Sequence, residues 1–199
     1  MTGVAVSARV DAAAATQGRP VRPLCRRALD LAGPGDGRLA LDLGCGRGVE
    51  ASAMLAEGWR VWALDRAPGA GELVRAGVAG AERLTVVRGA LQDVELPAAE
   101  LVHASYSLPF LPPADFGPVW QRVRGSLAPG GLLAVTLFGA GDTRHDRTDL
   151  TLLGRRQARE LFLGLEVLAF DDRAAEGTRA GGGSEGPGRV FEVIARRMR

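Results

Sequence analysis

Several residue types are missing or rare in this 199-residue chain. It contains no lysine and no asparagine, Ile194 is its only isoleucine, and all 25 basic residues are arginines. Such a bias is typical of nucleotide composition acting on codon choice, so the arginines carry little functional information. We expect Arg22, Arg26 and Arg27 on solvated faces. The missing lysine excludes a phosphate loop of the G-x-x-x-x-G-K-S/T type, because that loop needs its lysine to reach the phosphates.

Cysteine and histidine are also scarce, with two residues of each. Cys25 and Cys45 have no pair-like spacing, whereas secreted disulfide scaffolds usually carry several cysteines. This favours a reducing, cytoplasmic setting. The cysteines and histidines also lack the spacing of metal ligands, so we expect no metal site.

Long apolar runs and dense charge are absent too. No run approaches the roughly 20 residues that span a bilayer. The first 20 residues carry Arg9 and Asp11, where a signal peptide needs its apolar segment. We therefore expect a soluble protein that is not exported. A formal charge of +2 with interspersed acids provides no basic field for a nucleic-acid backbone, so we expect no nucleic-acid partner.

The chain alternates strand-like and helix-like segments. Residues 1–18 lack periodicity and are expected to form a flexible arm, while residues 19–199 form one domain. Strands are expected at 39–43, 59–64, 83–87, 101–105, 132–138, 165–170 and 189–195, and helices at 24–31, 49–57, 71–76, 115–127 and 155–163. This alternation predicts an α/β fold with a mostly parallel sheet and helices on both faces.

The last two strands flank a segment of unusual composition. Residues 171–188 are rich in Gly, Ala and charge, which predicts a mobile loop. A direct connection through such a loop is typical of a hairpin. The seventh strand is therefore predicted to run antiparallel to the rest.

A glycine-rich turn follows the first strand. The sequence reads Leu39-Ala-Leu-Asp42-Leu-Gly44-Cys-Gly46-Arg-Gly48-Val-Glu50. A strand, a glycine turn and a helix N-terminus together expose backbone N–H groups to a ligand. The dinucleotide pattern is G-x-G-x-x-G, but here the third glycine comes one residue early and Val occupies its place. The turn therefore favours a different cofactor.

Two acids lie at strand ends beside this turn. Asp42 would repel a pyrophosphate and would suit a cation such as S-adenosylmethionine, which has a sulfonium and an ammonium but no phosphate. Asp65 ends the second strand about 20 residues beyond the second glycine, a place suited to gripping ribose hydroxyls. The alternative is that both acids cap turns or helices and that the glycines only form the turn.

These segments resemble the class I S-adenosylmethionine-dependent methyltransferases. Leu39–Gly48 resembles the family's first motif, Gly58–Asp65 its second, and Leu127–Leu132 the turn before its fifth strand. Within the class, Ala104–Pro113 and Phe138–Asp142 resemble a bacterial small-molecule branch related to tellurite-resistance-type methyltransferases. The resemblance implies a Rossmann-like seven-stranded sheet in the order 3-2-1-4-5-7-6, with strand seven antiparallel.

The resemblance also implies a set of cofactor-binding residues. It places the methionine part against Asp42, Gly44, Cys45 and Gly46, the ribose at Asp65, the adenine at Arg66 and Leu91, and the reacting methyl beside Ser105. The family usually holds adenine with an Asp just before the apolar residue after strand three. Here Ala90 stands in that place, with Gln92 or Asp93 as possible substitutes.

Candidate catalytic residues follow strands four and five. Tyr106, Asp142 and His145 lie on the expected ligand side, and a general base is needed only if the acceptor carries a proton. Each has a plain alternative: Tyr106 as a pocket wall, Asp142 as a turn former and His145 as a solvated loop residue. His103, inside a buried strand, is expected to be a satisfied core histidine.

The sequence thus predicts a methyltransferase that uses S-adenosylmethionine and modifies an O, N, S or chalcogen atom of a small molecule. The chain lacks the Asn/Asp-Pro-Pro-aromatic motif of exocyclic-amine methylation and the Pro-Cys nucleophile of pyrimidine methylation, which favours a small acceptor. The alternative is a non-catalytic module that keeps the fold and serves as a binding or regulatory subunit. A nucleotide-linked oxidoreductase rests on topology alone.

Overall fold

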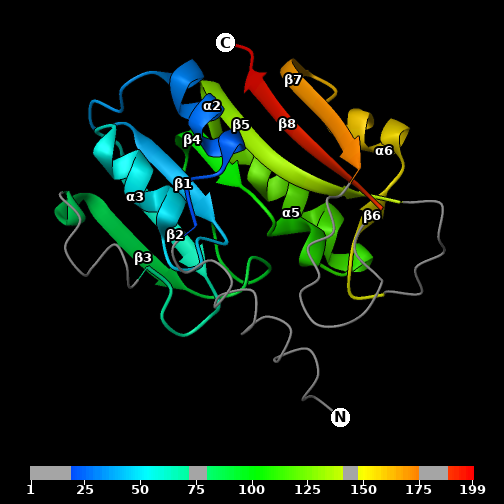
Figure 1. The fold of residues 1–199 in the computed structure, drawn as a ribbon, viewed down its shortest axis with the longest axis horizontal. Coiled ribbons are helices and arrows are strands. Elements are labelled where there is room, and N and C mark those ends of the chain that lie inside the picture. The colour runs from blue at the N-terminus through cyan, green and yellow to red at the C-terminus, as the bar shows by residue number, and fades with distance from the viewer. Residues whose placement is uncertain (1–18, 72–79, 141–147, 175–187) are drawn as a thin grey trace.

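The computed structural model describes residues 19–71, 80–140, 148–174 and 188–199. The described strands form one sheet in the order β3-β2-β1-β4-β5-β8-β7, and β6 pairs with β5 (Figure 1). They are β1 Leu39–Leu43, β2 Arg60–Asp65, β3 Leu84–Arg88, β4 Ala99–Ala104, β5 Leu127–Gly139, β6 Leu152–Leu153, β7 Leu165–Ala174 and β8 Arg189–Arg197. β8 runs antiparallel to both β5 and β7, and the other pairs are parallel. The predicted fold and antiparallel strand are confirmed, and so is the predicted strand order once the additional short strand β6 is set aside, because β7 and β8 are the predicted sixth and seventh strands.

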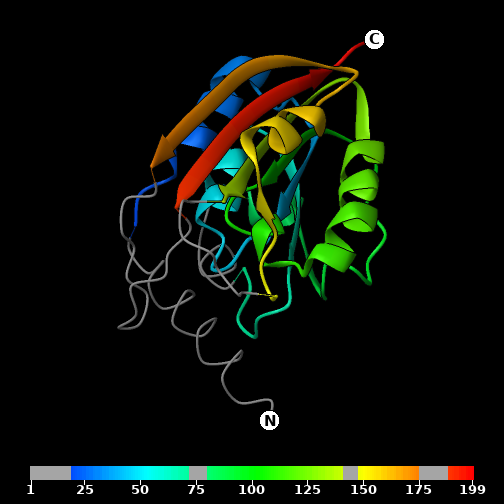
Figure 2. The ribbon, with the colours of Figure 1, turned by 90° about the vertical axis from the view of Figure 1, so that its right-hand side faces the viewer.

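Helices cover both faces of the sheet (Figures 1 and 2). The described α-helices are α2 Pro23–Ala32, α3 Val49–Ala56, α5 Pro113–Gly125 and α6 Arg155–Glu160; short 3-10 helices are η1 Ala81–Arg83 and η2 Leu108–Phe110. Side chains of α2 and α3 form one buried apolar cluster with the sheet, and those of α5 and α6 form another. β1 therefore lies between two cores. Its run of apolar residues fits a strand buried on both sides.

Most bounds shift by one to three residues, and the largest departures from the expected elements concern β7, β5 and β6. β7 continues to Ala174, into the predicted loop, because it pairs with β8 as far as Arg189 and Asp172 forms an ion pair with Arg189 at 2.6 Å. β5 begins at Leu127, ahead of the predicted start, with a register shift in its pairing to β4. β6 has two residues, too few to show a periodicity.

Other expectations fall outside the described residues. These are the arm at 1–18, most of the predicted helix at 71–76, and the part of the predicted mobile loop at 175–187. In the part of the chain that the structure describes, no helix is long and apolar enough to cross a membrane.

Candidate functional site

The glycine turn joins the carboxyl end of β1 to the amino end of α3. Gly44 has a φ of +84°, and a Cβ there would lie 2.4 Å from the Cβ of Ser107, in the loop after β4. Gly46 has a φ of +52°, yet a Cβ there would meet no heavy atom within 4 Å. Gly44 thus allows two loops to pack closely, whereas Gly46 borders open space. The open side is where a ligand can approach the backbone.

Asp65, the last residue of β2, fixes this turn. Its Oδ2 accepts a hydrogen bond from the Gly46 N–H at 2.8 Å, and its Oδ1 accepts one from the Ala67 N–H at 2.8 Å. The second bond is a local turn of the kind that Asp commonly forms. Each carboxylate oxygen keeps a further lone pair, so these bonds leave capacity for ligand hydroxyls. The turn-forming and ligand-binding roles of Asp65 are therefore compatible.

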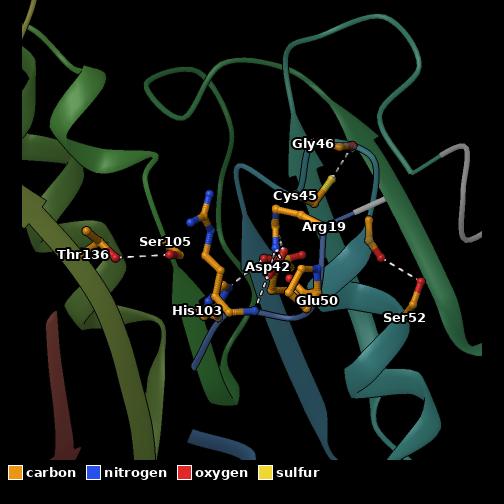
Figure 3. A network of polar contacts seen from close by, with 12 residues as sticks. Arg19, Asp42, Cys45, Gly46, Glu50, Ser52, His103, Ser105 and Thr136 are labelled. Atoms are coloured by element: carbon orange, nitrogen blue, oxygen red, sulfur yellow. Dashed lines mark hydrogen bonds and ion pairs between the residues drawn. The ribbon is translucent and has the colours of Figure 1, made fainter. Parts of the chain in front are cut away.

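Asp42 lies beneath the turn and pairs with His103. The two residues are register partners in β1 and β4, and Asp42 Oδ1 lies 2.9 Å from His103 Nδ1 (Figure 3). Both residues are 2% exposed. Burial raises the pKa of Asp42, and the hydrogen bond from His103 opposes that rise. In the described residues, neither Asp42 Oδ2 nor His103 Nε2 has a hydrogen-bond partner. The predicted core histidine is thus only half satisfied.

Glu50, in the first turn of α3, holds the segment that precedes α2. Its two carboxylate oxygens each lie 2.5 Å from the guanidinium of Arg19, and Oε1 also accepts a bond from the Arg22 N–H at 3.1 Å. Burial alone would raise the pKa of Glu50, but the hydrogen bonds and charge of Arg19 bring it below its usual value. Glu50 is therefore an ionised anchor, and Figure 3 shows it beside Asp42.

Arg22 joins Glu50, through its backbone, to Tyr106 just after β4, through its side chain. Its guanidinium carbon lies 4.3 Å from the centre of the Tyr106 ring, and burial lowers its pKa. Within the described residues, this guanidinium has no hydrogen bond or ion pair. Arg26 and Arg27 are exposed as expected, but the prediction of a solvated Arg22 was wrong because Glu50 ties its backbone to the turn.

Tyr106 adopts a backbone conformation that is unusual for a large side chain. Its φ is +53°, and its ring also meets Phe138 edge to face at 5.9 Å. Left-handed φ values are uncommon outside glycine and are often tied to function. The preceding residue, Ser105, is buried and shares a 3.1 Å hydrogen bond with Thr136 of β5. The end of β4 is thus rigidly placed beside the glycine turn.

Two hollows in the described structure lie elsewhere. One, of about 530 Å³, is lined by residues 155–163, from α6 and the segment just after it. The other, of about 490 Å³, lies at the amino ends of the parallel strands and is lined by Arg38, Glu100 and Arg196 among others. Ligands of open α/β sheets bind at the carboxyl ends of the strands, so the glycine turn is the stronger candidate.

A family profile described as a methyltransferase domain matches residues 40–131. This stretch runs from β1 into β5, so it contains the glycine turn, Asp65 and the end of β4. The matched region is similar to a methyltransferase domain, which agrees with the family predicted from the motifs.

The chain is also similar to a curated sequence. The carboxy-S-adenosyl-L-methionine synthase of Geobacter metallireducens is 29% identical over 133 residues, which cover 59% of this chain and 50% of that protein. The chain thus spans about half the length of this relative.

Two solved structures share the fold of this chain. TehB from Haemophilus influenzae has a TM-score of 0.73 at 13% identity, over 89% of this chain and 62% of TehB. The 1,6-didemethyltoxoflavin-N1-methyltransferase of Burkholderia thailandensis, solved with 1,6-didemethyltoxoflavin and S-adenosylhomocysteine, has a TM-score of 0.65 at 20% identity, over 89% of this chain and 78% of that enzyme.

The fold brings most of the predicted site residues to one edge of the sheet, at the carboxyl ends of the parallel strands. Asp42, Gly44, Cys45 and Gly46 lie in β1 and its turn, Asp65 and Arg66 at the end of β2, Leu91 after β3, and Ser105 and Tyr106 after β4. Arg66 is exposed and Leu91 is half-buried. The Gly89 N–H donates to the Asp65 carbonyl at 3.1 Å, which joins the ends of β2 and β3. Asp142 and His145 lie outside the described residues. All these roles stay predictions.

The sequence did not indicate three residues of this edge: Arg19, Arg22 and Glu50. The arginine-rich composition hid the first two. Glu50 did offer a signal, because an acid lies among apolar and small residues at the start of a helix whose first turn is buried. A buried carboxylate needs a charged partner, and only the structure shows which arginine provides it.

Proposed function

We propose that the domain binds S-adenosylmethionine at the glycine turn and transfers its methyl group to an O, N, S or chalcogen atom of a small molecule. The observation that carries the proposal is the bond from the Gly46 N–H to Asp65. It places a carboxylate with spare acceptor capacity beside the open side of the turn. A nucleoside diol has two hydroxyl donors that match those acceptors.

The charges of the edge fit the methionine part of this cofactor. Its ammonium and sulfonium are cations, and the carboxylates of Asp42 and Asp65 lie on either side of the turn. Its carboxylate needs a donor, and the guanidinium of Arg22 is free of ion pairs within the described residues. We assign Arg22 to that carboxylate. Arg66 and Leu91 then flank the adenine.

Methyl transfer needs little acid–base catalysis from the protein. The acceptor's lone pair forms the new bond to the methyl carbon, and the carbon–sulfur electron pair stays on sulfur, which becomes a neutral thioether. Positioning and exclusion of water therefore supply much of the rate. Ser105 and Tyr106 provide walls beside the methyl. Tyr106, Asp142 and His145 are the candidate bases for an acceptor that must lose a proton.

Two observations support a small-molecule acceptor. The Burkholderia enzyme was solved with a small heterocyclic molecule and S-adenosylhomocysteine. The chain also lacks the two nucleic-acid methylation motifs described above. The Geobacter relative is named as a synthase of a carboxylated form of the cofactor, so carboxylation of the cofactor is a second reaction to test.

Calorimetric titration with S-adenosylmethionine and S-adenosylhomocysteine tests cofactor binding. We expect both to bind, and Asp65→Ala to weaken binding by about 1–3 kcal/mol because the ribose loses its acceptors. Asp30→Ala, at an exposed position of α2, is the matched control and should bind normally. Absence of binding at millimolar ligand would contradict the proposal.

Turnover is tested separately, by following S-adenosylhomocysteine release with a panel of small O, N, S and chalcogen acceptors. Mass spectrometry of the nucleoside fraction also detects carboxylation of the cofactor. Release with at least one acceptor is expected. Binding without turnover across the panel would favour the non-catalytic module.

A further inference from the structure

The Asp42–His103 pair is more deeply enclosed than a ligand-binding carboxylate usually is. The side chains are 3% and 2% exposed, and they meet through Oδ1 and Nδ1 alone. Each also has a second polar atom, Oδ2 or Nε2, that is buried and without a partner in the described structure. Buried polar atoms in proteins are nearly always hydrogen-bonded. A pair with two such atoms is expected to have a role beyond packing.

The protonation of the pair determines the charge beneath the glycine turn. A neutral His103 that donates Nδ1–H to the Asp42 carboxylate gives the pair a charge of −1. One added proton makes the pair neutral, wherever that proton resides. Because the two groups share one hydrogen bond, the titration belongs to the pair.

Three neighbouring elements of the described structure present charged or titratable groups to the pair. They are Glu50 of α3, Asp65 of β2 and Cys25 of α2, and Glu50 is itself in contact with Arg19 and Arg22 of the segment before α2. The bidentate ion pair with Arg19 partly offsets the charge of Glu50, and burial raises the pKa of the Cys25 thiol. Asp65 is a further carboxylate near the turn, and it disfavours a negative pair. Burial, with Glu50 and Asp65 adding to it, raises the pKa of Asp42 and so favours proton uptake by the pair when no cation is bound at the turn.

A cation at the turn reverses that preference. The interior screens charge weakly, so a positive group bound at the turn would stabilise the negative form of the pair. We propose that the Asp42–His103 pair couples cofactor binding to proton release, and that it recovers the proton when the sulfonium charge disappears. This rests on the proposed function, since it needs S-adenosylmethionine at the turn.

The coupling follows the charge of the cofactor through one turnover. Binding of the sulfonium form expels the proton to solvent. Methyl transfer leaves a neutral thioether, so the pair regains part of its proton affinity and takes a proton from solvent. The residues around the bound product then carry less negative charge. His103 acts as a positioning residue that keeps Asp42 ready for this exchange, and it does not contact the reacting atoms.

Proton release is measured on the native protein by calorimetry in two buffers of different ionisation enthalpy. We expect a fraction of a proton to leave when S-adenosylmethionine binds, and less when S-adenosylhomocysteine binds. Affinity for S-adenosylmethionine should fall as pH decreases, by at most about tenfold per pH unit for one linked proton. Equal proton release with both nucleosides, or none with either, would overturn the coupling while leaving the proposed function standing. Failure of both to bind would remove both proposals.

The His103→Gln variant isolates the pair. Glutamine donates a hydrogen bond to Asp42 but does not titrate, and the ammonium of the free ligand is common to the titrations of both proteins. We expect the difference in proton release between the two nucleosides to shrink in this variant. An unchanged difference in a variant with native thermal unfolding would overturn the role of His103. Methylthioadenosine, which lacks both the sulfonium and the ammonium, should release no proton from the native protein.

Discussion

Glu50 grips the guanidinium of Arg19 through both carboxylate oxygens, at 2.5 Å each, across 31 positions of the chain. The same carboxylate accepts the backbone N–H of Arg22, which lies over the Tyr106 ring. One buried acid at the start of α3 thus ties the segment before α2 to two sides of the proposed cofactor site.

Replacing Glu50 by Gln should destabilise the protein and weaken cofactor binding. The change removes a charge-assisted pair and leaves Arg19 without its anion, which we expect to cost about 1–3 kcal/mol of unfolding free energy. Chemical denaturation measures it. A double-mutant cycle with Arg19→Gln should show coupling between the two sites. Additive effects would mean that the contact contributes little.

The same variant should differ from the native protein in its pH dependence. The pKa of Glu50 is lowered in the folded state, so its stabilisation is present above the ordinary glutamate pKa of about 4.3 and is lost as pH falls through the folded value. The native protein and Glu50→Gln should differ in unfolding free energy at neutral pH, and the difference should shrink as the pH falls below the ordinary glutamate pKa. A constant difference at all pH values would contradict this.

Replacing Asp42 by Asn should stabilise the fold, in contrast to Glu50→Gln. Burial raises the pKa of Asp42, so its ionised form lowers the stability of the fold at neutral pH. We expect the variant to melt at a higher temperature than the native protein at pH 8, with the gain shrinking as pH falls. It should also bind S-adenosylmethionine more weakly. A variant that melts lower at pH 8 would show that the charged pair with His103 outweighs the desolvation.

Gly44 and Gly46 form a matched pair for substitution by alanine. Gly44→Ala places a Cβ against Ser107 and should destabilise the fold as well as the site. Gly46→Ala has room for its Cβ and should cost only about 1–2 kcal/mol of left-handed strain, while obstructing the ligand. Thermal unfolding and calorimetric binding separate the two effects. Normal cofactor affinity in folded Gly46→Ala would place the ligand elsewhere.

Arg22→Gln tests the proposed contact with the cofactor's carboxylate. Loss of a hydrogen-bonded charge should weaken S-adenosylmethionine binding by about 1.5–3 kcal/mol. Methylthioadenosine, which has no amino-acid part, should bind the variant and the native protein equally. Arg26→Gln, at an exposed position of α2, is the control. Equal losses of affinity for both ligands would mean that Arg22 only supports the structure of the segment before α2.

The sheet was predictable because its signals are local. Apolar strands, glycine turns and helices alternate along the chain, and the order of β1 to β5 follows from that alternation and the family resemblance. β6 and the far end of β7 escaped prediction because their residues are fixed by pairing with distant strands. Neither two apolar residues nor a charged strand end carries a periodicity of its own.

The candidate site was predictable only where it is continuous in sequence. The turn and its acids appear in two short motifs, so Asp42, Gly46 and Asp65 could be singled out. The contacts from Arg19 to Glu50 and from Asp42 to His103 join residues 31 and 61 positions apart. A sequence read along the chain has no signal for such pairs, and the abundance of arginine conceals the partner of Glu50.

A crystal structure of the protein with S-adenosylhomocysteine would locate the cofactor site. We expect the nucleoside at the carboxyl ends of β1 and β2, with its ribose hydroxyls on the Asp65 carboxylate and its amino-acid carboxylate near Arg22. A nucleoside bound away from the Gly44–Gly48 turn, or no bound nucleoside at saturating concentration, would contradict this expectation.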